Sequence, residues 1–151
     1  MILMAGLLCA PVMVSADEAK AAPVIPPAVT PSAKGAKVYL IGTKDGKTLK
    51  SKNGEVLLRF GLKGMGVAPA GVYFENTGHH HLLIDMDVSE IPAGTPIPTI
   101  EGKSLHFGKG QTEAKVKLAP GKHTLQLVLG NYSHLLHEPA VVSEKITVTV
   151  E

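Results

Sequence analysis

The chain has 151 residues, with 15 Lys and Arg against 13 Asp and Glu, a formal net charge of +2. This length suits one domain, and so small a charge argues against nucleic acid as a partner. Aromatic residues make up 4% of the chain and Trp is absent, which argues against a stacking surface for single strands or sugars. Seven histidines against one cysteine are the unusual feature that a functional interpretation must explain.

Residues 1–16 are typical of a cleaved signal peptide. Ile2 to Val14 is almost wholly apolar, is too short to span a bilayer comfortably, and leads to a small-residue pattern ending at Ala16. A basic n-region is missing, because no Lys or Arg precedes Lys20. We expect a periplasmic or secreted protein whose mature chain has no integral membrane span. Cleavage would remove Cys9, so thiolate catalysis and cysteine-ligated zinc are not expected, and a lipid anchor at this cysteine is the weaker alternative.

The rest of the sequence predicts a linker followed by an all-β domain. Residues 17–36 are rich in Ala and Pro without apolar periodicity, which is typical of a linker. Residues 37–151 contain short β-rich runs between Gly, Pro and Asp turns, with no sustained helical spacing. Seven or eight short strands predict an antiparallel, immunoglobulin-like β-sandwich. The expected strands are Val38–Ile41, Glu55–Leu62, Val72–Phe74, His79–Asp87, Ser104–Phe107, Ala114–Leu118, His123–Leu129 and Lys145–Val150.

Three consecutive histidines begin the fourth of these strands. Because side chains alternate across a strand, His80 shares a face with Leu82 and Ile84. His79 and His81 share the opposite face. We therefore expect His80 to be a core or rim histidine, and the other two to be able to chelate one metal ion.

The four remaining histidines lie on later segments. His123 shares a face with a row of leucines and should lie at the entry to the core. His106 should point outward or toward a strand end. His134 and His137 form a His-x-x-His pair in a loop, a spacing compatible with one ion if the loop turns.

A transition-metal site is the chemistry that this histidine excess favours. Neutral imidazoles suit copper, zinc or nickel, whereas calcium and magnesium prefer oxygen ligands. One site of three or four ligands cannot use seven histidines, so some must support the ligands or the fold. The candidate ligands for copper or zinc are His79, His81, His106, His134 and His137. The residues expected to be structural or to orient the ligands are His80, His123 and Asp85.

Three separated segments carry a family resemblance: Glu75–Asp85, His106–Glu113 and Pro120–Gly130. They resemble a bacterial family catalogued as DUF4399, a domain of unknown function, and the similarity extends from about Lys37 to the end. The segment 131–133 departs from the family's more polar, histidine-containing loop. The resemblance implies an exported domain and supplies no biochemical activity.

Two functions therefore compete. The first is a periplasmic metal-binding module that works as a buffer, chaperone or sensor for copper or zinc. The second is a non-catalytic envelope interaction module that binds a protein partner and whose histidines form a structural hydrogen-bonded cluster. An enzyme is not expected, because His79, His81, Asp85 and His123 resemble the cupin ligand pattern only loosely, and no nucleophile elbow or phosphate-binding loop is present.

Overall fold

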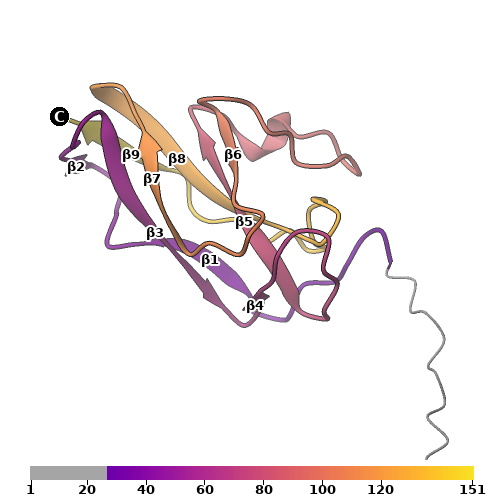
Figure 1. The fold of residues 1–151 in the computed structure, drawn as a ribbon. Coiled ribbons are helices and arrows are strands. Elements are labelled where there is room, and N and C mark those ends of the chain that lie inside the picture. The colour runs from indigo at the N-terminus through magenta and orange to yellow at the C-terminus, as the bar shows by residue number, and fades with distance from the viewer. Residues whose placement is uncertain (1–26) are drawn as a thin grey trace, which may run out of the picture.

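The computed structural model describes residues 27–151, so the predicted signal peptide and the first part of the predicted linker lie outside the described residues. Two β-sheets face each other (Figure 1). The first has the order β1-β3-β7, formed by β1 (Lys37–Ile41), β3 (Glu55–Lys63) and β7 (Glu113–Lys117). The second has the order β2-β9-β8-β5-β4, and β6 also pairs with β5. Its members are β2 (Lys47–Leu49), β4 (Gly66–Val67), β5 (Thr77–Ile84), β6 (Ser104–His106), β8 (Gly121–Gly130) and β9 (Ile146–Val150).

The predicted β-sandwich is confirmed, with nine strands in the described residues rather than seven or eight. The pairing is not purely antiparallel, since β2 runs parallel to β9 and β4 runs parallel to β5. The predicted strand at residues 72–74 is wrong. Thr77 Oγ1 donates a hydrogen bond to the Phe74 carbonyl at 2.8 Å, and Asn76 has a positive φ of 55°, so this segment turns into β5 instead of pairing.

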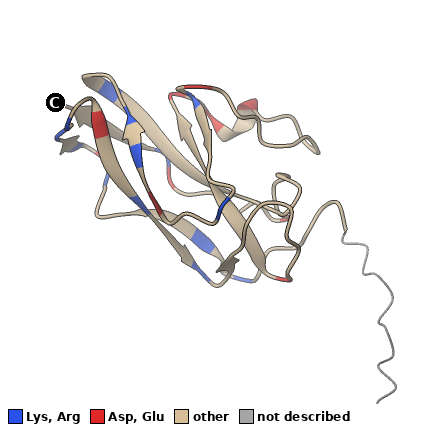
Figure 2. Ribbon diagram, in the orientation of Figure 1, with Lys and Arg blue, Asp and Glu red and all other residues tan. Residues whose placement is uncertain are grey.

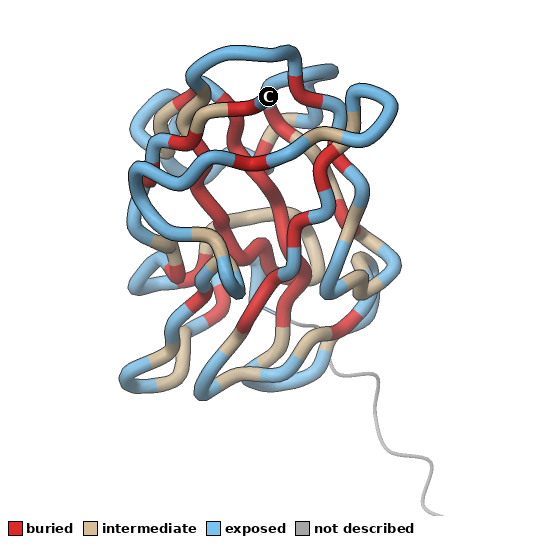
Figure 3. Tube along the Cα trace, turned by 90° about the vertical axis from the view of Figure 1, so that its left-hand side faces the viewer, coloured by how far each residue is buried: buried red, intermediate tan, exposed pale blue. Residues whose placement is uncertain are grey.

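The main hydrophobic core lies between the two sheets. Its fully buried side chains include Leu58 of β3, Leu82 of β5 and Leu127 of β8. Burying a leucine side chain contributes about 1.5–3 kcal/mol relative to leaving it exposed, so each of these side chains stabilises the fold. In Figure 3 the buried segments run through the middle of the molecule and the exposed loops lie around them.

A second, smaller apolar cluster lies on the outer face of the larger sheet. It consists of Leu83, Met86, Ile91, Ile97 and Val128. The segments 85–103 and 131–145 cover this face, so the molecule has a third layer made of loops (Figure 1). A β-sandwich strand normally leaves its outer residues in water. Here the outer residues of β5 are buried as deeply as the inner ones.

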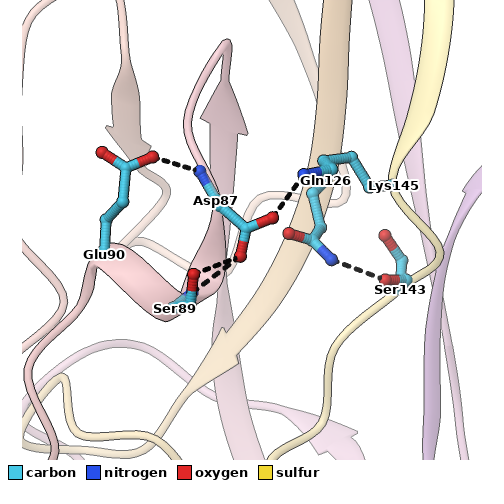
Figure 4. Close-up of polar contacts among 6 residues, drawn as sticks. All are labelled: Asp87, Ser89, Glu90, Gln126, Ser143 and Lys145. Atoms are coloured by element: carbon cyan, nitrogen blue, oxygen red, sulfur yellow. Dashed lines mark hydrogen bonds and ion pairs between the residues drawn. The ribbon is translucent and has the colours of Figure 1, made fainter.

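Polar contacts fasten the two covering segments to each other and to the sheet (Figure 4). Asp87 caps the short 3-10 helix η1 (Val88–Glu90) by accepting hydrogen bonds from Ser89, and its other carboxylate oxygen pairs with Lys145. Gln126 of β8 donates from Nε2 to the Ser143 carbonyl at 3.1 Å. These contacts hold the loops over β5 and β8.

The described end of the predicted linker lies against the domain. Thr30 is buried, and the Ser32 amide donates to the Glu138 carbonyl at 3.1 Å. The Glu138 amide in turn donates to the Thr30 carbonyl at 3.0 Å, and Asn131 Nδ2 donates to the Ala28 carbonyl at 2.9 Å. Residues 28–32, called the N-terminal strap below, are therefore attached to the loop at 131–138.

Charged residues lie on the loops and on strands of both sheets, but none lies on β5 (Figure 2). Within the described residues, no helix has the length and the apolar character that crossing a bilayer requires.

Candidate metal centre

The alternation predicted for β5 is confirmed. His80 points into the main core, where its ring lies 5.3 Å from that of Phe60, and its Nδ1 lies 3.2 Å from the Gln111 carbonyl oxygen. His79 and His81 point to the opposite face, toward the covering loops. All three histidines have an exposed fraction of 0%, so the face predicted to carry the chelating pair is buried as well.

Strand register brings His106 to the same place. In the β5–β6 pair His81 lies directly opposite His106. The Phe107 amide donates to the His80 carbonyl at 3.0 Å. His80 and Phe107, the next pair along the two strands, are therefore a hydrogen-bonded pair. His81 and His106 therefore form a non-hydrogen-bonded pair, in which the Cα atoms are about 4.5 Å apart and the side chains are closest.

His79, His81 and His106 form one compact group, called the histidine triad below. Each offers a ring nitrogen, and these three nitrogens lie within 4.8 Å of one another. The Nε2 atoms of His79 and His81 are 3.0 Å apart and share a hydrogen bond. The His106 ring centroid lies 5.0 Å from each of the other two. The triad combines two alternate residues of one strand with a cross-strand neighbour.

Several ring nitrogens of the triad are buried without a hydrogen-bond partner. These are Nδ1 of His79, Nδ1 of His81 and Nε2 of His106. Buried polar atoms are nearly always paired, because leaving one unpaired costs about 1–3 kcal/mol. Three such nitrogens lie in this one group. Apolar side chains could fill the same space without this cost, so packing alone does not explain the histidines.

Two glycines provide space for the imidazoles. A Cβ added at Gly130, which lies opposite His79 in the β5–β8 pair, would be 2.9 Å from His81 Nε2. A Cβ added at Gly108 would be 2.3 Å from His106 Cε1. Neither glycine has a positive φ, so close approach of the rings is the reason for glycine at both positions.

The triad is electrically neutral at pH 7. Burial, followed by the repulsion of neighbouring imidazolium charges, lowers the pKa of His79 to about 3 and that of His81 to about 2. Burial, with the nearby His134, also lowers the pKa of His106. Neutral imidazole is the form that binds metal ions, so no proton has to be removed before an ion enters.

The loop after β8 places His134 beside the triad. Its ring centroid lies 4.9 Å from that of His79 and 4.7 Å from that of His106. Its backbone adopts a positive φ of 67°, and its carbonyl accepts a hydrogen bond of 2.8 Å from the Ile97 amide. Its ring nitrogens are not among the three that lie within 4.8 Å of one another. His134 thus covers the triad from the loop side.

His137 belongs to a different set of contacts, so the structure does not unite the predicted His-x-x-His pair in the triad. Its Nδ1 lies 2.9 Å from Thr30 Oγ1 in the N-terminal strap. Its Nε2 faces Gly78, where an added Cβ would be 2.9 Å away. Burial lowers the pKa of His137. Sequence reasoning missed Thr30 because the strap has the composition of a linker.

Asp85 and His123 pair with each other at the far end of β5. His123 Nδ1 lies 2.7 Å from Asp85 Oδ2, and its Nε2 lies 2.9 Å from the Ala119 carbonyl oxygen. The cupin-like ligand set is therefore wrong for this chain. Asp85 lies beyond the end of β5, where its carboxylate accepts hydrogen bonds from His123 and the Thr124 amide, and it does not belong to the group formed by His79 and His81.

The comparisons with known proteins concern the family and one distant structure. A family model described as a domain of unknown function, DUF4399, matches residues 58–151. The match starts inside β3, later than the start near residue 37 expected from the resemblance. Comparison with curated proteins finds no match. A chain from the structures of Clostridium thermocellum CbhA fibronectin(III)-like modules is similar with 11% identity and a TM-score of 0.42. The alignment covers 76% of this chain and 45% of that chain, so this chain spans less than half of the solved one.

Proposed function

The chain belongs to the DUF4399 family, and we propose that it binds one transition-metal ion, copper or zinc, at the histidine triad. One observation carries the proposal: three neutral imidazole nitrogens from β5 and β6 lie within 4.8 Å of one another in a buried setting. In a tetrahedral site with metal–nitrogen bonds of about 2.0–2.1 Å, the nitrogens lie about 3.3 Å apart. Small rotations of the rings would bring the triad to that spacing.

The chemistry of the ligands supports copper or zinc over other ions. Imidazole nitrogen is a good ligand for both, whereas calcium and magnesium require several oxygen ligands. The partnerless nitrogens also support the proposal. A bound ion gives some of the buried ring nitrogens the partner that the described residues do not offer.

The burial of the site supports a holding role, as a buffer or sensor, more than rapid transfer. His79 and His81 have no exposed surface, so an ion must enter past His134 and His106, which are half-buried. Release then requires the loop at 131–138 to move. A periplasmic or secreted location is part of this proposal, and it depends on the predicted signal peptide at residues 1–16.

A second candidate is an envelope interaction module in which the histidines are structural. The hydrogen bond of 3.0 Å between His79 Nε2 and His81 Nε2 favours it, because it shows that two imidazoles can satisfy each other without an ion. In that case the loops over β5 bind a protein partner, and the triad only fixes their position.

Elemental analysis separates the two candidates. The mature, untagged protein is purified from the periplasm without chelators, and its copper, zinc and nickel contents are measured. We expect about one ion per chain in the native protein, and its loss in His106→Ala, which changes a half-buried ligand. His123→Gln is the matched control, because His123 pairs with Asp85 outside the triad.

The outcome that contradicts the metal proposal is equally concrete. If the native protein contains only trace metal and none of the three ions raises its melting temperature on addition, the triad is structural. Enrichment of a specific protein partner from the periplasm by the same metal-free protein would then support the interaction module.

A further inference from the structure

The electrostatic setting of the triad limits the charge of the ion that it can hold. The compact group contains three histidines, and no Asp or Glu oxygen of the described residues belongs to it. The ligand set is therefore neutral, and the full charge of a bound ion stays uncompensated.

The surroundings of the triad are also apolar. Leu83 and Val128 have an exposed fraction of 0% and Ile97 one of 3%, and they form the cluster on the same face of the sheet. Ile97 approaches the triad closely, since its Cδ1 and His81 Nε2 are both within 3.2 Å of a Cβ placed on Gly130. The free-energy cost of moving an ion from water into such a medium rises with the square of its charge. For a monovalent ion this cost is therefore about a quarter of that for a divalent ion.

The number of ligands points the same way. Three ring nitrogens converge, whereas a zinc ion with three histidine ligands needs a water molecule in its fourth position. A monovalent d10 copper ion is stable with two or three ligands and binds imidazole. His134 lies beside the group, and its nitrogens are outside the set of three that converge.

We propose that the triad is selective for monovalent copper, Cu(I), held by His79, His81 and His106 in a three-coordinate site. This inference rests on the proposed metal-binding function and specifies its ion. The selectivity comes from a neutral ligand set in apolar surroundings, which disfavours Zn(II) by its double charge even though imidazole is a good zinc ligand.

Competition measurements test the selectivity. The mature, untagged chain is titrated without oxygen against a coloured Cu(I)–bicinchoninate complex, and separately against a coloured zinc indicator. We expect one equivalent of Cu(I) to leave the bicinchoninate, and about a tenfold excess of Zn(II) not to displace it. X-ray absorption at the copper edge should show the signature of three-coordinate Cu(I) with nitrogen ligands.

The variant His106→Asp sharpens the test by adding the missing negative charge at a half-buried position. It should lower the ratio of Cu(I) affinity to Zn(II) affinity at least about tenfold, because a carboxylate compensates the second charge of zinc. His106→Asn is the matched neutral variant, and it should weaken both ions without reversing their order. Circular dichroism confirms that both variants are folded.

The results distinguish this inference from the proposed function. Displacement of Cu(I) by an equal concentration of Zn(II) in the native protein overturns the Cu(I) selectivity and leaves a histidine metal site in place. An unchanged affinity ratio in His106→Asp overturns the electrostatic explanation. Failure to bind either ion overturns both proposals.

Discussion

The two faces of β5 bury alternate residues of one strand in two different ways. On the inner face, Leu82 and Ile84 pack between the two sheets, among the apolar side chains of the main core. On the outer face, His79 and His81 lie under two loops, next to a cluster of only a few apolar residues. The inner face needs only apolar residues of suitable size at the right period. The outer face instead packs imidazole rings against glycine positions that have no room for a side chain.

The largest effect is expected on the inner face. Leu82→Ala removes a fully buried side chain from between the sheets and should lower the free energy of unfolding by about 2–5 kcal/mol. Leu83→Ala, the matched change on the outer face, should cost less, because loops can relax into the space more easily than a sheet can. Urea unfolding measures both. Equal losses would contradict the distinction between a rigid inner face and an adaptable outer one.

The next effect concerns the space for the imidazoles. Gly130→Ala places a methyl group 2.9 Å from His81 Nε2, so the ring must move. We expect a loss of stability of about 1–3 kcal/mol from overpacking, together with at least a tenfold loss of metal affinity.

Gly66→Ala is the control for this change, since the nearest atom to its added Cβ is the flexible Thr77 Cγ2 at 3.3 Å. Calorimetric titration with metal and urea unfolding measure the two quantities. Unchanged metal binding in folded Gly130→Ala would show that His81 is not a ligand.

A smaller effect is expected at the far end of the strand, from the pair of Asp85 and His123. The hydrogen bond that His123 donates to the Asp85 carboxylate raises the pKa of His123 above 6.5. Although burial opposes its ionisation, the hydrogen bonds from His123 and Thr124 lower the pKa of Asp85 below 3.8. The stability contributed by His123 is full below pH 6.5 and is lost as the pH rises through its raised pKa. The contribution of Asp85 is present above pH 3.8 and is lost as the pH falls through its lowered pKa.

Asp85→Asn should therefore cost most between pH 3.8 and 6.5. Because the Asp85 side chain is 47% exposed, we expect less than about 1 kcal/mol there. Asn tolerates the positive φ of 51° at this position and can still accept the hydrogen bond from the Thr124 amide. Free energies of unfolding measured from pH 3 to 9 test the profile. A cost that grows steadily above pH 7 would contradict it.

The smallest effect is expected for the histidine that points inward. His80→Leu removes a buried Nε2 atom that has no partner, but it also removes the contact of Nδ1 with Gln111. These changes oppose each other, so the free energy of unfolding should change by only about 0.5 kcal/mol. The metal content should stay the same as in the native protein. A loss of metal in this variant would show that His80 contributes to metal binding. It would contradict the assignment of metal binding to the outer face of β5 alone.

Much of this fold follows from residue patterns alone. Residue patterns predicted β3, β5, β8 and β9 to within two or three residues at each end, through apolar runs of strand length in β3 and β5 and through period-2 alternation in β8 and β9. The three residues of β2 were missed, since two of them are exposed and the strand pairs only at the edge of the sheet. Residues 72–74 have the β-branched and aromatic composition of a strand, yet a turn at Asn76 determines their conformation.

The site was predictable only in part. Alternation placed His79 and His81 on one face, and His106, which lies beside them, was among the candidate ligands. Their burial was not, because it depends on loops of more than ten residues folding back over the sheet, which no local pattern encodes. The separate position of His137 depends on its contact with Thr30, 107 residues earlier in the chain. Contacts at that separation depend on the finished fold.

The N-terminal strap has a mechanical consequence. Its hydrogen bonds join Ala28 to Asn131, and they join both Thr30 and Ser32 to Glu138. All three strap residues precede the start of β1. A pulling force applied to the chain ahead of residue 28 therefore acts first on the hydrogen bonds of the N-terminal strap. It reaches the β1–β3 pair only after these hydrogen bonds break. Load on that end of the chain therefore acts first on the loop that covers the histidine triad.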